Sequence, residues 1–162
     1  MKIRSLLLPA FVALVLSGCG QKDAAPAAAA AAPAAAGPRV VEITANDTMK
    51  YSVTMIGAKA GEQLKVVLTN TGTMPKDVMG HNFVLLKAGS DAAAFSTAAV
   101  AAKETGYIPA ALKDQVIASI DLLGPRKSGE VVFTVPGPGE YPFLCSFPAH
   151  FAVGMKGTLI VK

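Results

Sequence analysis

The sequence predicts an all-β domain, a sandwich or small barrel of about eight short strands with one inserted helix. Three observations support this prediction. Hydrophobic and polar residues mostly alternate between residues 39 and 162, which is the period of half-buried strands. Gly, Pro, Asn and Asp separate the alternating segments. One segment departs from the alternation and has the composition of a helix.

Eight segments show the strand pattern. In chain order they are RVVEITA (39–45), MKYSVTM (49–55), GEQLKVVLTN (61–70), HNFVLLK (81–87), QVIASIDLL (115–123), GEVVFTV (129–135), GEYPFLC (139–145) and KGTLIVK (156–162). Alanine is abundant between residues 91 and 104, where Ser90 or Asp91 could cap a helix and Gly106 could stop it. We therefore predict one helix near residues 91–104.

The residues before this domain predict export. Lys2 and Arg4 precede an apolar run that is too short to span a bilayer. The run ends in LSGC (16–19), which resembles a bacterial lipobox, so residues 1–18 are predicted to be a signal peptide and Cys19 to be lipidated.

Residues 19–38 are nearly all alanine with interspersed prolines, which predicts a solvated tether to the membrane. Residues 39–162 then form one folded domain. Gly20 follows the predicted lipidated cysteine where aspartate commonly retains lipoproteins at the inner membrane, so we expect an outer-membrane anchor facing the periplasm in a cell with two membranes.

The charge of the chain argues against a nucleic-acid partner. The formal net charge is +4, and loss of Lys2 and Arg4 with the signal peptide lowers it to +2. Such a small charge is not the footprint of a nucleic-acid-binding domain.

Cys145, His150 and Met155 lie in one segment, with four residues between successive members, and His81 is the only other histidine. If Cys19 carries lipid, Cys145 has no disulfide partner within the chain. Two imidazoles, a thiolate and a weak thioether are the ligand set of blue-copper electron-transfer sites. The residues therefore predict one copper ion.

Other interpretations stay open at this point. Each residue alone could belong to the core, and Cys145 could be a nucleophile with a histidine base, although no carboxylate or amide residue flanks His150 to orient it. Two histidines and a cysteine also bind zinc. Copper delivery or storage is a further alternative, although the methionine-rich or histidine-rich runs frequent in such proteins are absent from the tether sequence.

The segments MPKDVMGHNFV (74–84) and CSFPAHFAVGMKGTLIVK (145–162) resemble the ligand-bearing segments of small blue copper proteins, the azurins and auracyanins. The resemblance implies a cupredoxin-like Greek-key β-sandwich with one type 1 copper. It implies His81, Cys145 and His150 as equatorial ligands, Met155 as the axial ligand and the Gly80 carbonyl as a second, distant axial contact. It also implies an electron carrier between extracytoplasmic redox proteins that converts no substrate of its own.

The same resemblance implies supporting roles for other residues. Asn82 is expected to bond to the Cys145 loop near Ser146. An apolar surface patch around the His150 imidazole is expected to dock redox partners, and its members are Met49, Met74, Val78, Met79, Phe147 and Ala149. Four residues separate His150 from Met155, as in auracyanin and plastocyanin, whereas azurins typically have three.

Overall fold

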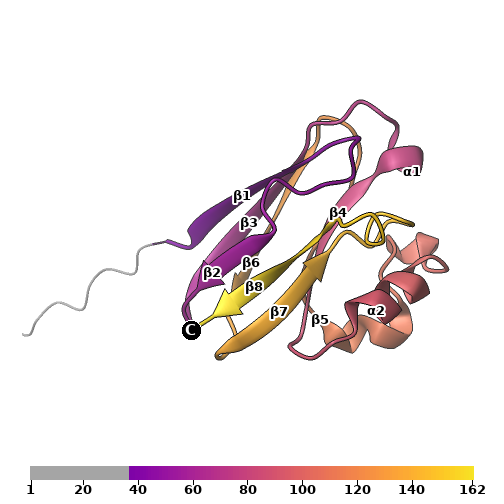
Figure 1. Cartoon of the computed structure of the whole chain (residues 1–162). Helices are drawn as coiled ribbons and strands as arrows, with labels where there is room; N and C mark the ends of the chain where they lie inside the picture. The colour runs from indigo at the N-terminus through magenta and orange to yellow at the C-terminus, as the bar shows by residue number, and fades with distance from the viewer. Residues whose placement is uncertain (1–36) are drawn as a thin grey trace, which may run out of the picture. The chain divides into compact units, whose positions relative to one another are not determined.

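The computed structural model describes residues 37–162, in which eight strands form two sheets (Figure 1). The prediction of an all-β sandwich is confirmed. The predicted signal peptide, Cys19 and nearly all of the tether lie outside the described residues. Within residues 37–162, no helix has both the length and the apolar character needed to cross a bilayer.

The strands form one sheet of three and one of five. Their bounds are β1 Arg39–Ala45, β2 Met55–Ala58, β3 Gln63–Asn70, β4 His81–Leu86, β5 Val116–Leu123, β6 Ser128–Thr134, β7 Gly139–Leu144 and β8 Lys156–Val161. The sheet orders are β1-β3-β6 and β2-β8-β7-β4-β5. Two short α-helices, α1 (Lys76–Met79) and α2 (Ala92–Ala99), and two 3-10 helices, Lys103–Thr105 and Ala110–Gln115, connect them.

The pairing of β4 with β7 brings distant segments together. These strands run antiparallel with Val84 opposite Leu144. The start of β4, at His81, therefore lies beside the residues that follow β7, beginning with Cys145. The loop from β7 to β8 lies at the opposite end of the sandwich from the start of β1 (Figure 1).

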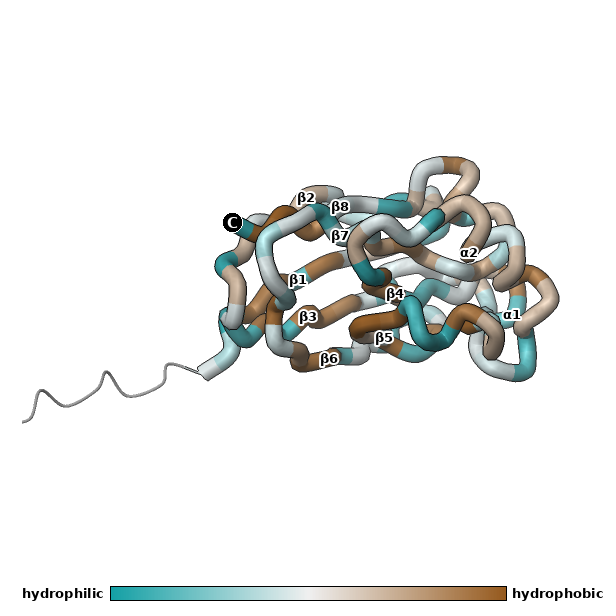
Figure 2. Tube along the Cα trace, turned by 90° about the horizontal axis from the view of Figure 1, so that it is seen from below, coloured by the Kyte–Doolittle hydropathy of each residue, from teal (hydrophilic) through white to brown (hydrophobic). Residues whose placement is uncertain are grey.

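Alternating burial builds the core between the sheets. In β3, Leu64, Val66 and Leu68 are buried while the intervening residues are partly exposed, and Figure 2 shows hydrophobic positions recurring along this sheet. All six residues of β4 are buried, because its outer face is covered as well. There Val84 and Leu144 pack with Phe95 of α2.

The predicted strand at residues 49–55 is wrong, because β2 begins at Met55. The Asn46 side chain accepts hydrogen bonds from the amide and hydroxyl of Thr48 and so forms a turn. Met49 then adopts a left-handed conformation with φ of 55°. Only Tyr51 makes a β-bridge, to Ala45.

The predicted helix exists but is shorter than residues 91–104. The Asp91 carboxylate caps α2, accepting hydrogen bonds from the amides of Ala93 and Ala94 at 2.9 Å each. The helix ends at Ala99, and the chain continues through a turn and the 3-10 helix Lys103–Thr105, which Gly106 caps with a φ of 65°. The sequence signals thus marked the beginning and end of an interrupted helical region.

Candidate metal centre

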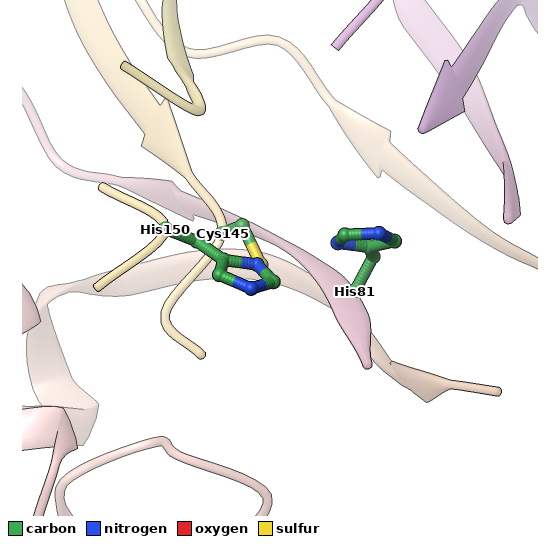
Figure 3. A group of neighbouring side chains, drawn as sticks. All are labelled: His81, Cys145 and His150. Carbon is green, nitrogen blue, oxygen red and sulfur yellow. The ribbon is translucent and has the colours of Figure 1, made fainter. Parts of the chain in front are cut away.

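Three side chains with metal-binding atoms converge at one end of the sandwich. One ligand atom from each of His81, Cys145 and His150 lies within 4.8 Å of the others, and all three residues are buried. The Cys145 Sγ lies 3.4 Å from the His150 Nδ1, and the two imidazole centroids are 5.0 Å apart. Figure 3 shows His81 on β4 facing the pair formed by Cys145 and His150.

Backbone hydrogen bonds shape the loop that carries the other sequence-predicted ligands. The Cys145 amide donates to the Met155 carbonyl at 3.1 Å, which closes the loop between β7 and β8. The Met155 amide donates to the His150 carbonyl at 2.9 Å. Met155 is fully buried. The structure therefore brings Met155 back to the end of β7, next in the ladder to Cys145.

Gly80 is buried between α1 and β4 and immediately precedes His81. A Cβ atom at this position would lie 2.5 Å from the Lys76 carbonyl oxygen and 2.8 Å from the Leu122 side chain. Glycine therefore permits the close approach of α1 to the sheet that places His81.

A buried pair of polar side chains joins the two ligand-bearing segments. The Asn82 Nδ2 donates to the Ser146 Oγ at 2.8 Å, and the Ser146 amide donates to the Asn82 Oδ1 at 2.8 Å. The Tyr51 hydroxyl donates to the Asn82 carbonyl. No sequence pattern marks Tyr51 as part of the site, because only the folded loop brings it to β4.

Burial keeps the metal-free site uncharged. It raises the pKa of the Cys145 thiol to about 12, although the backbone N–H groups of Asn82 and Phe147 act in the opposite direction. Burial, with a smaller effect of nearby His81, lowers the pKa of His150 to about 4. Burial also lowers the pKa of His81, opposed by the Asn46 carbonyl and the Asp47 charge. A thiol and two neutral imidazoles face one another.

The donor atoms fit a metal ion. Neither His81 ring nitrogen has a hydrogen-bond partner among residues 37–162, although both atoms are buried. A buried polar atom without a partner costs about 1–3 kcal/mol, and coordination would supply the missing interaction. Two imidazoles with a nearby cysteine sulfur and a buried methionine match the ligand preferences of copper.

Comparison with known proteins agrees with this chemistry. Residues 39–162 match the profile of copper binding proteins of the plastocyanin/azurin family. The chain belongs to this family. Its cofactor is therefore copper, and its family consists of electron carriers, not enzymes.

Individual relatives span most of the domain. Azurin from Pseudomonas denitrificans is 36% identical over 129 residues, covering 75% of this chain and 97% of the relative. Azurin from Bordetella pertussis is 37% identical over 136 residues, covering 82% and 89%. Auracyanin-B from Chloroflexus aurantiacus is 33% identical over 125 residues, covering 76% of this chain and 52%, about half, of the relative.

Solved auracyanin structures share the fold of this cupredoxin. The dithionite-reduced auracyanin from Roseiflexus castenholzii has a TM-score of 0.69 and 35% identity, covering 76% of this chain and 96% of that one. Auracyanin A from Chloroflexus aurantiacus has a TM-score of 0.70 and 29% identity, covering 78% and 100%.

The structure corrects one member of the expected docking patch. Phe147 is only 7% exposed, because its ring packs between Tyr107, at 5.0 Å, and His150, at 4.7 Å between centroids. The side chain therefore supports the imidazole from inside the protein. Met74, Val78 and Ala149 are exposed, and Met49 and Met79 are half-buried.

The stability of the metal-free cupredoxin should fall in both acid and alkali. Between pH 6.5, the ordinary pKa of histidine, and about 4, the unfolded chain binds a proton at His150 that the folded protein excludes, so acidification favours unfolding. Between pH 9 and about 12, the unfolded Cys145 thiol ionises while the folded thiol does not, so alkali also favours unfolding.

Denaturant unfolding of the metal-free protein from pH 4 to pH 10 tests this expectation. The free energy of unfolding should be highest between pH 6.5 and 9, and His150→Gln should reduce the acid slope of the profile, leaving the part that His81 contributes. An acid side that keeps its slope in the variant would contradict the assignment to His150.

Proposed function

We propose that this cupredoxin shuttles single electrons between redox proteins outside the cytoplasmic membrane, and that a lipid on Cys19 tethers it there. His81, Cys145 and His150 would hold the copper ion, and the Met155 thioether and the Gly80 carbonyl would add weaker contacts. The observation that carries this proposal is the pair of partnerless His81 nitrogens beside the Cys145 thiol and His150. Bound copper would supply the one-electron couple between Cu(I) and Cu(II).

The protein contributes a thiolate and a fixed geometry. Cys145 must release its proton when metal binds, because the thiolate is the ligand form. The N–H groups of Asn82 and Phe147 favour that thiolate. The Asn82 and Ser146 pair holds β4 against the loop between β7 and β8 (residues 145–155), called the ligand loop below. The donor atoms therefore keep their separations when the electron moves.

Exposed apolar residues before and within α1 and in the loop between β7 and β8 suit short encounters with partners. Met74 and Val78 are 37% and 50% exposed, and Ala149 beside the histidine is also exposed. An apolar face without a strong charge supports brief, weakly specific contacts, which a carrier that must dock and leave requires. We propose the electron donor and acceptor to be redox proteins that meet this face.

The burial of Cys145 disfavours the nucleophile interpretation. A thiol with a pKa near 12 is almost entirely protonated at neutral pH, and the thiolate is the reactive form. The thiol instead becomes useful when a metal ion displaces its proton.

Copper loading followed by redox cycling tests the proposed function. Addition of Cu(II) to the purified protein should give an intense blue absorption band that ascorbate bleaches and a mild oxidant restores over repeated cycles. The reduced protein should retain copper in the presence of a weak Cu(I) chelator. Rapid loss of Cu(I) to that chelator would instead favour copper delivery, and a colourless protein that binds zinc would contradict the electron-carrier proposal.

A charge on the proposed docking face should slow electron exchange. Ala149 has a left-handed conformation with φ of 68°, which Asp and Asn tolerate comparatively well. Ala149→Asp should lower the rate of electron self-exchange between Cu(I) and Cu(II) protein about tenfold at low salt, because like charges would meet. NMR line broadening measures this rate.

The neutral variant Ala149→Asn is the matched control and should exchange electrons at close to the original rate. Both variants should keep the blue band. An Asp variant with an unchanged exchange rate would remove this face from the mechanism.

A further inference from the structure

The ligand loop has a carbonyl that a side chain from outside the loop holds. The Val153 amide donates to the Ala149 carbonyl at 3.2 Å and the Gly154 amide to the Phe151 carbonyl at 2.9 Å, so these residues form a helical turn. The last carbonyls of such a turn lack partners within it. Lys50 fills this role, because its ammonium donates to the Val153 carbonyl.

The backbone of Gly154 leaves room for that ammonium. A Cβ atom at Gly154 would lie 2.9 Å from the Lys50 Nζ, and φ at this residue is 97°. A side chain here would therefore be strained and would press on the lysine. The contact lies within the four residues that separate His150 from Met155.

The backbone segment that carries Lys50, residues 46–51, is held by several hydrogen bonds. The Asp47 carboxylate accepts hydrogen bonds from the Thr73 amide at 2.9 Å and hydroxyl at 3.0 Å. Tyr51, the next residue after Lys50, donates to the Asn82 carbonyl. The segment 46–51 thus reaches both β4 and the ligand loop, and its restraints limit where the Lys50 ammonium can go.

We propose that Lys50 is a positioning residue of the copper centre. By holding the Val153 carbonyl, it fixes the segment that joins His150 to Met155 and thereby the place of the thioether. This inference rests on the proposed function for its effect on copper, whereas the restraint on the loop exists without metal.

The metal-free protein allows a direct test of that restraint. Hydrogen exchange of the Met155 amide, which donates to His150, should be about five- to tenfold faster in Lys50→Met, because a charged hydrogen bond that closes the turn is lost. Lys50→Arg should restore slow exchange. Lys59→Met, in the turn between β2 and β3, makes the same charge change at the far end and should have no effect.

The copper-loaded proteins test the consequence for the centre. Lys50→Met should change the relative intensities of the visible copper bands and shift the reduction potential, and both should return toward the original values in Lys50→Arg. The changes should persist at high salt, where an effect of charge alone would be screened. Unchanged Met155 exchange and copper spectra in Lys50→Met would overturn the proposal, as would a potential shift that disappears at high salt with no spectral change.

The two hypotheses fail in different ways. A wild-type protein without a blue band would refute the copper carrier while the metal-free exchange experiment still decides whether Lys50 restrains the loop. A blue wild-type protein, together with a Lys50→Met variant whose Met155 exchange and copper spectrum are unchanged, would refute only the positioning role.

Discussion

Cys145→Ser should abolish the intense blue band and weaken copper binding by at least about 100-fold. Loss of a residue that only hydrogen-bonds to a metal ligand typically lowers metal affinity about 10- to 100-fold, and loss of a ligand itself should cost more. A serine hydroxyl is a hard oxygen donor and cannot replace the soft thiolate sulfur that suits copper. Titration with Cu(II), followed by absorption and by competition with a chelator of known affinity, measures both effects.

The fold should survive this substitution. Cys145 is fully buried, but the N–H groups of Asn82 and Phe147 that act on the sulfur can donate to a hydroxyl oxygen instead. Met155→Leu is the useful comparison, because it removes only the proposed axial thioether and should preserve a blue band at a shifted potential. A blue Cys145→Ser protein would refute thiolate ligation.

Gly157→Ala should lower the free energy of unfolding by about 3 kcal/mol, which is the upper end of the usual cost of overpacking a core. The added Cβ would lie 2.2 Å from the Phe143 Cζ and 2.4 Å from the Thr54 carbonyl oxygen. Phe143 is fully buried and has little room to move, because its ring packs against Tyr51 and Phe83. The Thr54 carbonyl also accepts the Thr158 amide at 2.9 Å.

Denaturant unfolding measures this loss of free energy. In thermal unfolding, the same loss should lower the melting temperature by about 10 °C for a domain of this size. Gly57→Ala on β2 is the matched control, because its added Cβ would meet nothing within 4 Å. Equal stability of the two variants would contradict the steric explanation.

Much of the fold followed from local patterns, since seven of the predicted strands overlap the observed ones closely. The exception illustrates the limit of such patterns. Residues 49–55 alternate like a strand, but the turn at Asn46 and the left-handed Met49 interrupt it. The strand forms only at Met55, where parallel pairing with Thr158 of β8 becomes available. A partner so far along the chain leaves no local signal.

The site likewise has residues that the sequence predicted and contacts that it could not predict. The spacing of Cys145, His150 and Met155, together with His81, suggested the residues that the structure brings together. The burial of Phe147 could not be predicted, because it depends on Tyr107 from a distant connecting segment. The contact between Lys50 and Val153 was also invisible, since a single lysine in an alternating segment resembles any solvated residue.

The ligand loop lies at the opposite end of the sandwich from the start of β1 (Figure 1). Arg39 bonds to Gly57, which pairs with Ile160 near the end of β8, whereas the ligand loop enters that strand at Lys156. If the domain were attached through the residues before β1, the end that carries the proposed copper site would be the end farthest from the attachment point. Rotation about that attachment would then sweep this end through the widest arc, so that anchoring and partner binding would not compete for one surface.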